Sequence, residues 1–152
     1  MRGIWLLLHI LGYTLWLGAG IATMVVGITA KGFAPDQRLA AYRLTSAVQR
    51  ILVGPGVVAV TLSGLVLSVR FMNPGVGPPG WMVLMMLTGI VGALIALGVS
   101  VPTAARLGRL ELDPRGDLPK SFAALRKRQV VAASIGGGMG LLALLAGTVL
   151  RG

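Results

Sequence analysis

The sequence predicts an all-α membrane protein, with four transmembrane helices in an up-down bundle, both termini outside and two basic cytoplasmic loops. The 152 residues are 55% hydrophobic with a mean hydropathy of +0.86, which is too apolar for a soluble domain of this size. Four apolar runs are each long enough to cross about 30 Å of hydrocarbon. The basic residues gather on alternate loops, which fixes the orientation. We therefore expect one domain, residues 1–152.

The first predicted span, 4–30, has no charged residue between Arg2 and Lys31 and holds the only histidine, His9. A helix of this length rises about 40 Å, more than the bilayer requires. A signal peptide with its cleavage site at 18–20 is the alternative. Because the uncharged run continues well beyond that point, the sequence favours an uncleaved span.

The second predicted span, 51–70, contains a glycine on either side of Pro55. This predicts a kink there, or a helix that only begins at the proline. Upstream, Pro35 and Asp36 are typical of a helix start. The basic helix that follows is expected either to lie at the cytoplasmic interface or to extend the span inward.

The third and fourth predicted spans, 81–105 and 129–150, form a second hairpin. Pro102 predicts a kink near the cytoplasmic end of the third span. Asp117 is the expected cap of a short basic helix before the fourth. An uncharged outer loop, 72–80, joins the two hairpins. Their similar layouts suggest a duplication, which residue identities do not demonstrate.

Eleven of the 14 basic residues follow the first and third spans, leaving only Arg2, Arg70 and Arg151 for the other side. This asymmetry predicts a multi-pass protein of the bacterial inner membrane. The net charge of +10 does not indicate nucleic acid, because basic loops beside a membrane meet anionic headgroups. The expected partner is the lipid bilayer. The absence of cysteine excludes disulfides and thiolate chemistry.

Small residues recur at helical spacing and predict close helix packing. The predicted packing glycines are Gly12, Gly20, Gly27, Gly89, Gly92, Gly136, Gly140 and Gly147. The stripe on the fourth span is also a candidate docking face, for a homodimer or for a larger membrane complex.

The predicted spans contain no carboxylate, lysine or internal arginine. Hydrolysis lacks an activated nucleophile, and proton-coupled transport lacks its usual intramembrane acid, so an enzyme is disfavoured. His9 shares a helical stripe with Trp5 and Trp16, and Tyr13 flanks it. A neutral imidazole can ligate haem iron or copper, and aromatic rings suit a porphyrin or a quinone.

His9 is therefore the candidate metal ligand, and it forms a candidate cofactor site with Trp5, Tyr13 and Trp16, for which haem b is the named cofactor. The simpler alternative is an imidazole that hydrogen-bonds to a hydroxyl or a backbone carbonyl of another span. Copper passage ranks below both. Three methionines, at 82, 85 and 86, cluster near the outer surface, where a core-filling role is equally well founded.

Five features occur in order: His9, Trp16-Leu17-Gly18, Arg50 before a second span that contains glycine and proline, Gly80-Trp81, and Gly116-Asp117-Leu118-Pro119. This order resembles a bacterial family of predicted four-span integral membrane proteins of unknown function. That family is distantly similar to the copper-resistance protein D membrane domain and to the haem-containing membrane protoporphyrinogen oxidases. The resemblance implies that His9 matches a haem-associated histidine. The chain departs from the oxidase pattern in lacking a second histidine and a lysine in span three, where 83–87 lies.

The sequence thus predicts a non-catalytic binding or accessory component of the membrane, with a haem or other small-ligand site at His9. The alternatives are a haem-dependent oxidoreductase related to porphyrinogen oxidation, a structural subunit of a larger membrane complex, and a copper transporter.

Overall fold

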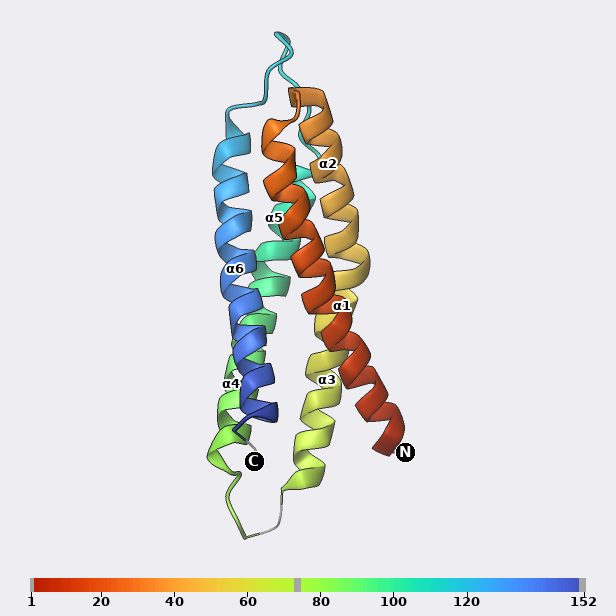
Figure 1. The fold of residues 1–152 in the computed structure, drawn as a ribbon, viewed down its shortest axis with the longest axis vertical. Coiled ribbons are helices and arrows are strands. Elements are labelled where there is room, and N and C mark those ends of the chain that lie inside the picture. Colours follow the sequence, from red (N-terminus) through yellow and green to blue (C-terminus); the bar gives the residue numbers. More distant parts are fainter. Residues whose placement is uncertain (1, 73–74, 151–152) are drawn as a thin grey trace.

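A computed structural model describes residues 2–72 and 75–150, which form four long helices running alternately up and down (Figure 1). The first is α1 (Arg2–Thr29), which ends in the 3-10 turn η1 (Ala30–Gly32). The second runs through α2 (Pro35–Val48), the π-helical segment η2 (Gln49–Val53) and α3 (Gly54–Phe71). The third comprises α4 (Gly80–Ile95), the π-helical η3 (Ala96–Ser100) and α5 (Val101–Leu107), and the fourth is α6 (Ser121–Thr148).

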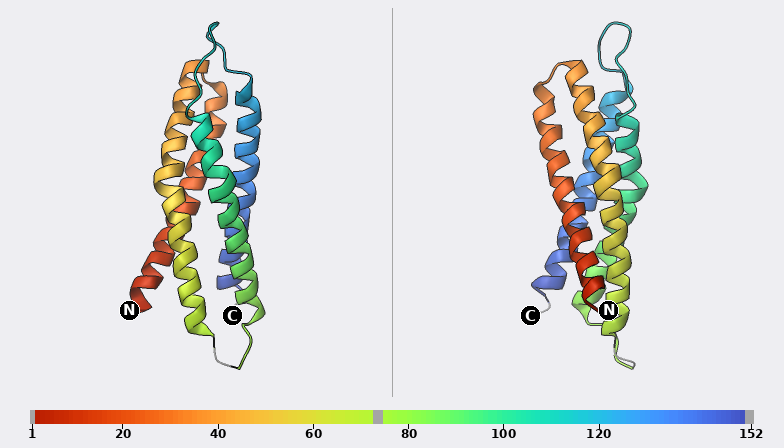
Figure 2. Two further views of the ribbon diagram at one scale, coloured as in Figure 1. Left: turned by 180° about the vertical axis from the view of Figure 1, so that it is seen from behind. Right: turned by 90° about the vertical axis from the view of Figure 1, so that its right-hand side faces the viewer.

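All four helices are long and apolar enough to cross a membrane, so the predicted four-helix fold is confirmed and the chain is a multi-pass membrane protein. Large apolar side chains face outward along the bundle; Leu7 is 62% exposed and Val69 68%. Such surfaces match hydrocarbon rather than water. The start of α1 and the end of α6 lie at the same end of the bundle (Figures 1 and 2). The basic segments lie at the opposite end.

Both internal prolines are accommodated without ending a helix. Pro55 has no N–H to offer the preceding turn, and the π-helical segment η2 lies directly before α3, where that hydrogen bond is missing. The second helix therefore continues from Pro35 to Arg70. The expectation of a late start at Pro55 is wrong, and the basic helix is continuous with the second span. Pro102 likewise follows η3.

The segment before α6 differs from its prediction. Asp117 caps no helix; α6 begins at Ser121, and its N-cap residue, Lys120, makes no side-chain capping bond. Instead the carboxylate of Asp113 accepts the amides of Arg115 and Asp117, each at 2.9 Å, which closes an Asx-type turn. The predicted basic helix is therefore the first part of α6. Of the predicted outer loop 72–80, positions 73–74 fall outside the described residues, as does Arg151.

In each hairpin the two helices pack through a pair of glycines, and the second pair lies 80 residues after the first in the sequence. A Cβ on Gly12 would lie 2.8 Å from the carbonyl oxygen of Gly56, and one on Gly92 would lie 3.1 Å from that of Gly136. These glycines allow α1 to approach α3, and α4 to approach α6, at backbone contact. The same offset relates Tyr42 to Phe122, whose rings meet edge to face 5.2 Å apart. The hairpins therefore share an internal pseudo-symmetry of contacts.

The remaining predicted packing glycines divide into two groups. Gly140 lies against Trp16 and Leu17, Gly147 against Met85, and Gly89 and Gly27 make looser contacts near 3.9 Å. Gly20 differs from its prediction, because a Cβ there would meet no described atom within 4 Å.

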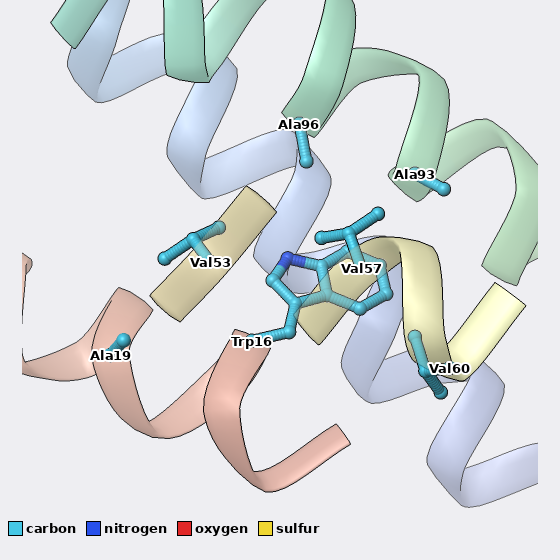
Figure 3. Packing of buried hydrophobic residues seen from close by; sticks show 7 residues of the cluster. All are labelled: Trp16, Ala19, Val53, Val57, Val60, Ala93 and Ala96. Carbon is cyan, nitrogen blue, oxygen red and sulfur yellow. The ribbon is translucent and has the colours of Figure 1, made fainter. Parts of the chain in front are cut away.

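The central core is built around Trp16, which is 4% exposed. Its indole extends from α1 toward Val57 of α3 and Ala96 of η3 (Figure 3). Ala19 of α1 and three residues of the second and third helices complete the cluster, namely Val53, Val60 and Ala93. Small residues around one large ring let the four helices converge at this level.

Candidate ligand cavity at His9

A cavity of about 510 Å³ lies between the helices in the half of the bundle that carries the termini. His9, Tyr13 and one edge of Trp16 border it from α1, and α3, α4 and α6 supply the rest of its wall. The lining described contains no Asp, Glu, Lys or Arg. We refer to this space as the His9 cavity. Its size falls within the roughly 300–1,000 Å³ typical of small-molecule sites.

The imidazole of His9 is fixed in one tautomer by α3. Its Nδ1 lies 3.0 Å from the carbonyl oxygen of Val60 and 3.2 Å from the hydroxyl of Ser63. A carbonyl only accepts, and the Ser63 hydroxyl gives its own proton to the carbonyl of Ala59. Nδ1 must therefore carry the hydrogen, and Nε2 carries the free lone pair. No described residue hydrogen-bonds to Nε2.

This arrangement is the one that proteins use to orient a ligating histidine. A backbone carbonyl that accepts from Nδ1 holds the ring and raises the basicity of the other nitrogen. Gly64 of α3 makes room for the ring, because a Cβ there would lie 3.0 Å from His9 Cε1. The sequence offers a simpler alternative, in which the imidazole only hydrogen-bonds to a hydroxyl or a carbonyl of another span. The structure contains this hydrogen bond, which uses Nδ1 and leaves Nε2 available.

The three aromatic residues predicted beside His9 have different surroundings. Tyr13 lines the cavity, and its hydroxyl donates to the carbonyl oxygen of Gly140 on α6. Trp16 also lines the cavity and belongs to the buried core. Trp5 lies outside the lining of the cavity. The structure thus brings His9, Tyr13 and Trp16 together and leaves Trp5 apart.

The methionines of α4 contribute to the same cavity. Met82, Met85 and Met86 all line it, and Met82 is only 2% exposed. The sequence placed them near the outer surface without linking them to His9. Helical spacing could put the three on one helix, but it could not show that this helix faces α1. Among the residues that the structure describes, no three His, Cys, Asp or Glu side chains gather into a metal site.

A buried polar level beyond Trp16 was also missed. Gln49 donates to Thr23 at 3.3 Å, and Gln129 donates to Ser100 at 2.9 Å. The side-chain oxygens of both glutamines are buried and have no hydrogen-bond partner in the described part of the chain. The signal in the sequence is a glutamine beside an arginine in each hairpin, Gln49-Arg50 and Arg128-Gln129. Each amide ties the two helices of its own hairpin together.

We compared the chain with known protein families, curated proteins and solved structures. No protein-family model, no curated protein and no solved structure gives a significant match to the chain.

Proposed function

We propose that this membrane protein is a non-catalytic binding component of the bacterial inner membrane, and that the His9 cavity holds its ligand. The observation that carries the proposal is the tautomer of His9, whose Nδ1 is committed to Val60 and whose Nε2 faces a cavity of ligand size with no hydrogen-bond partner among the described residues. An imidazole held at membrane depth with one open nitrogen favours a ligand over a purely structural bond.

Haem b is the ligand that the donor set fits best. A bare metal ion needs several protein ligands, whereas a porphyrin brings its own equatorial nitrogens and needs only axial ones. His9 would hold the haem iron through its nitrogen, and a thioether of Met85 or Met86 from the same lining would be a suitable second ligand. Haem supplies one-electron chemistry when bound. The resemblance of His9 to a haem-associated histidine supports the same ligand class.

The binding role is favoured over an oxidoreductase because the cavity offers few groups that could move a proton. Tyr13 already donates to Gly140, and the described lining has no carboxylate or lysine. Complementation of a strain that lacks its porphyrinogen oxidase tests the alternative. Growth of that strain would overturn the non-catalytic assignment.

The absorbance spectrum of protein expressed in haem-replete cells and purified in mild detergent tests the haem assignment. We expect a Soret band that His9→Ala abolishes. Gly64→Ala keeps the imidazole but places a methyl group 3.0 Å from Cε1, so haem affinity should fall by roughly tenfold, as for other changes behind a metal ligand.

Gly138→Ala is the matched control, because a Cβ there meets no described atom within 4 Å. It should bind haem like the parent protein. A folded parent protein with no Soret band would refute haem as the ligand.

Monovalent copper is a second candidate, favoured by the methionines. Thioethers are soft ligands that suit Cu(I), and imidazole also binds copper. Met82, Met85 and Met86 share the cavity with His9. Competition with a chromogenic Cu(I) chelator under anaerobic conditions tests it. Met85→Leu should then weaken copper binding and leave the fold intact.

The stripe of Gly136, Gly140 and Gly147 is not a free docking face in this fold. These glycines pack against Gly92, Trp16 and Met85 inside the chain. A homodimer or a larger complex would therefore need another surface.

A further inference from the structure

A second cavity, of about 620 Å³, lies at the basic end of the bundle. It is bordered by α2, by the segment that leads into α6, and by the first turns of α6. Four cationic side chains line it, and the described lining contains no carboxylate: the cations are Arg38, Lys120, Arg126 and Lys127. We refer to this space as the basic pocket. It lies far along α6 from the His9 cavity, and nothing about it depends on the function proposed there.

Two arginines of the basic pocket are held by a buried aromatic pair. The Nε of Arg126 donates to the hydroxyl of Tyr42 at 2.8 Å. The guanidinium of Arg38 lies 5.6 Å from the centre of the Phe122 ring. Tyr42 and Phe122 pack edge to face and are both nearly buried. Because each arginine is supported by a ring of the other hairpin, the two guanidinium groups are fixed at one place.

Within the part of the chain that the structure describes, these two arginines lie without an acidic partner. No carboxylate of the described residues forms an ion pair with either of them. The Nε of Arg38 is buried and has no hydrogen-bond partner among the described residues, which leaves a donor of a charged group unused. The uncapped N-terminus of α6 adds a further positive partial charge beside them. Among the described residues, the cationic side chains of the basic pocket therefore have no anion to balance their charge.

The rest of the wall is apolar and continues onto the lipid-facing side of α6. Val130 and Val131 line the pocket and are 52% and 48% exposed. An anion bound by the arginines would thus have hydrocarbon surface directly beside it. A soluble anion would leave that surface exposed, whereas the acyl chain of a phospholipid would cover it.

We propose that the basic pocket binds the phosphate of an anionic membrane phospholipid, with Arg38 and Arg126 as its ligands and the Val130 and Val131 surface under the first part of an acyl chain. Arginine suits this task because its planar fork can donate two hydrogen bonds to one phosphate. The pseudo-equivalent positions 80 residues away are Leu118 and Ser46, so the internal repeat does not create a second copy of the site.

Native mass spectrometry of the full chain in detergent tests the proposal. Phosphatidylglycerol and phosphatidylcholine with identical acyl chains are added at equal concentration, and retained lipid is counted. We expect phosphatidylglycerol to be retained in preference to phosphatidylcholine. Arg38→Gln and Arg126→Gln should each weaken its binding by about tenfold, since each removes charge-assisted hydrogen bonds.

Arg43→Gln and Arg128→Gln are the matched controls. They remove the same charge from the same two helices, but both side chains are exposed and lie outside the pocket lining. Their effect should stay below about twofold. Equal loss in all four variants would overturn the proposal, because it would indicate diffuse attraction to a basic surface.

Two tryptophan variants keep the test decisive even if the arginine variants fail to fold. Ala123→Trp places a large ring in the pocket from an exposed position that lines it, and Ala124→Trp places one on an exposed position outside it. Only the first should displace phosphatidylglycerol; equal retention by the two would count against the pocket. Soluble glycerol phosphate is the last probe. If it binds as tightly as phosphatidylglycerol, the pocket takes a free phosphate and the lipid assignment fails.

Discussion

The contact between α1 and α3 at Gly12 offers a sharp test of the packing. A Cβ added there would lie 2.6 Å from the backbone nitrogen of Val60 and 2.8 Å from the backbone oxygen of Gly56. Ordinary contact begins at 3.4 Å, so Gly12→Ala requires α3 to move back by about 0.8 Å. A gap of that size forfeits about a quarter to a half of the dispersion attraction of the separated atoms.

The matched control lies on the same helix. Gly20→Ala adds the same methyl group where no described atom lies within 4 Å, and the gain in helix propensity, about 1 kcal/mol, is common to both variants. The difference between them therefore reports the contact alone. Overpacking of this kind costs about 1–3 kcal/mol, so Gly12→Ala should be less stable than Gly20→Ala by that amount.

Unfolding in mixed micelles with increasing SDS, followed by the fluorescence of the tryptophans, gives the two free energies of unfolding. Trp16 lies one turn from Gly12 and should report the separation of the helices. A difference below about 0.5 kcal/mol would refute the backbone contact between α1 and α3.

Three further predictions use the same unfolding assay. Gly147→Ala should cost less than about 0.5 kcal/mol although its Cβ would lie 2.9 Å from the sulfur of Met85, because a flexible thioether moves more easily than a backbone; a loss like that of Gly12→Ala would contradict this. Tyr42→Phe removes the acceptor of Arg126 Nε and should cost about 1 kcal/mol, and no change would mean that the bond contributes nothing. Gln129→Leu removes a buried oxygen without a partner as well as one hydrogen bond, so stability should change by less than about 1 kcal/mol; a loss above about 2 kcal/mol would show that the oxygen is satisfied.

The fold class could be read from the sequence because hydropathy is a local property. A run of apolar residues such as 4–30 must be shielded from water whatever it packs against, and a helix satisfies its own backbone. The stripe that holds His9 was partly readable, since helical period fixes which side chains share a face, but Trp5 of that stripe lies outside the cavity. The sequence therefore located the candidate ligand residue without knowledge of its neighbours.

The helix limits were harder to predict because proline has two outcomes. Pro55 and Pro102 each remove a hydrogen bond, which can end a helix or be absorbed by a wider turn. The choice depends on whether the helix gains enough packing on both sides of the proline. Here Val53 and Val57 both lie in the Trp16 core, so the helix continues. Local propensity contains no information about that gain.

By itself the sequence determined that the chain crosses a membrane four times and that one imidazole lies among the helices. Only the tertiary structure decided what each face meets. It turned Trp16 into the core and left open space, among the described residues, where a Cβ on Gly20 would lie. It also placed the Val60 carbonyl against His9 and the Arg38 guanidinium against Phe122. The physical reason is that periodicity defines the face of a helix, whereas the rotation and depth of one helix against another depend on the side chains of both.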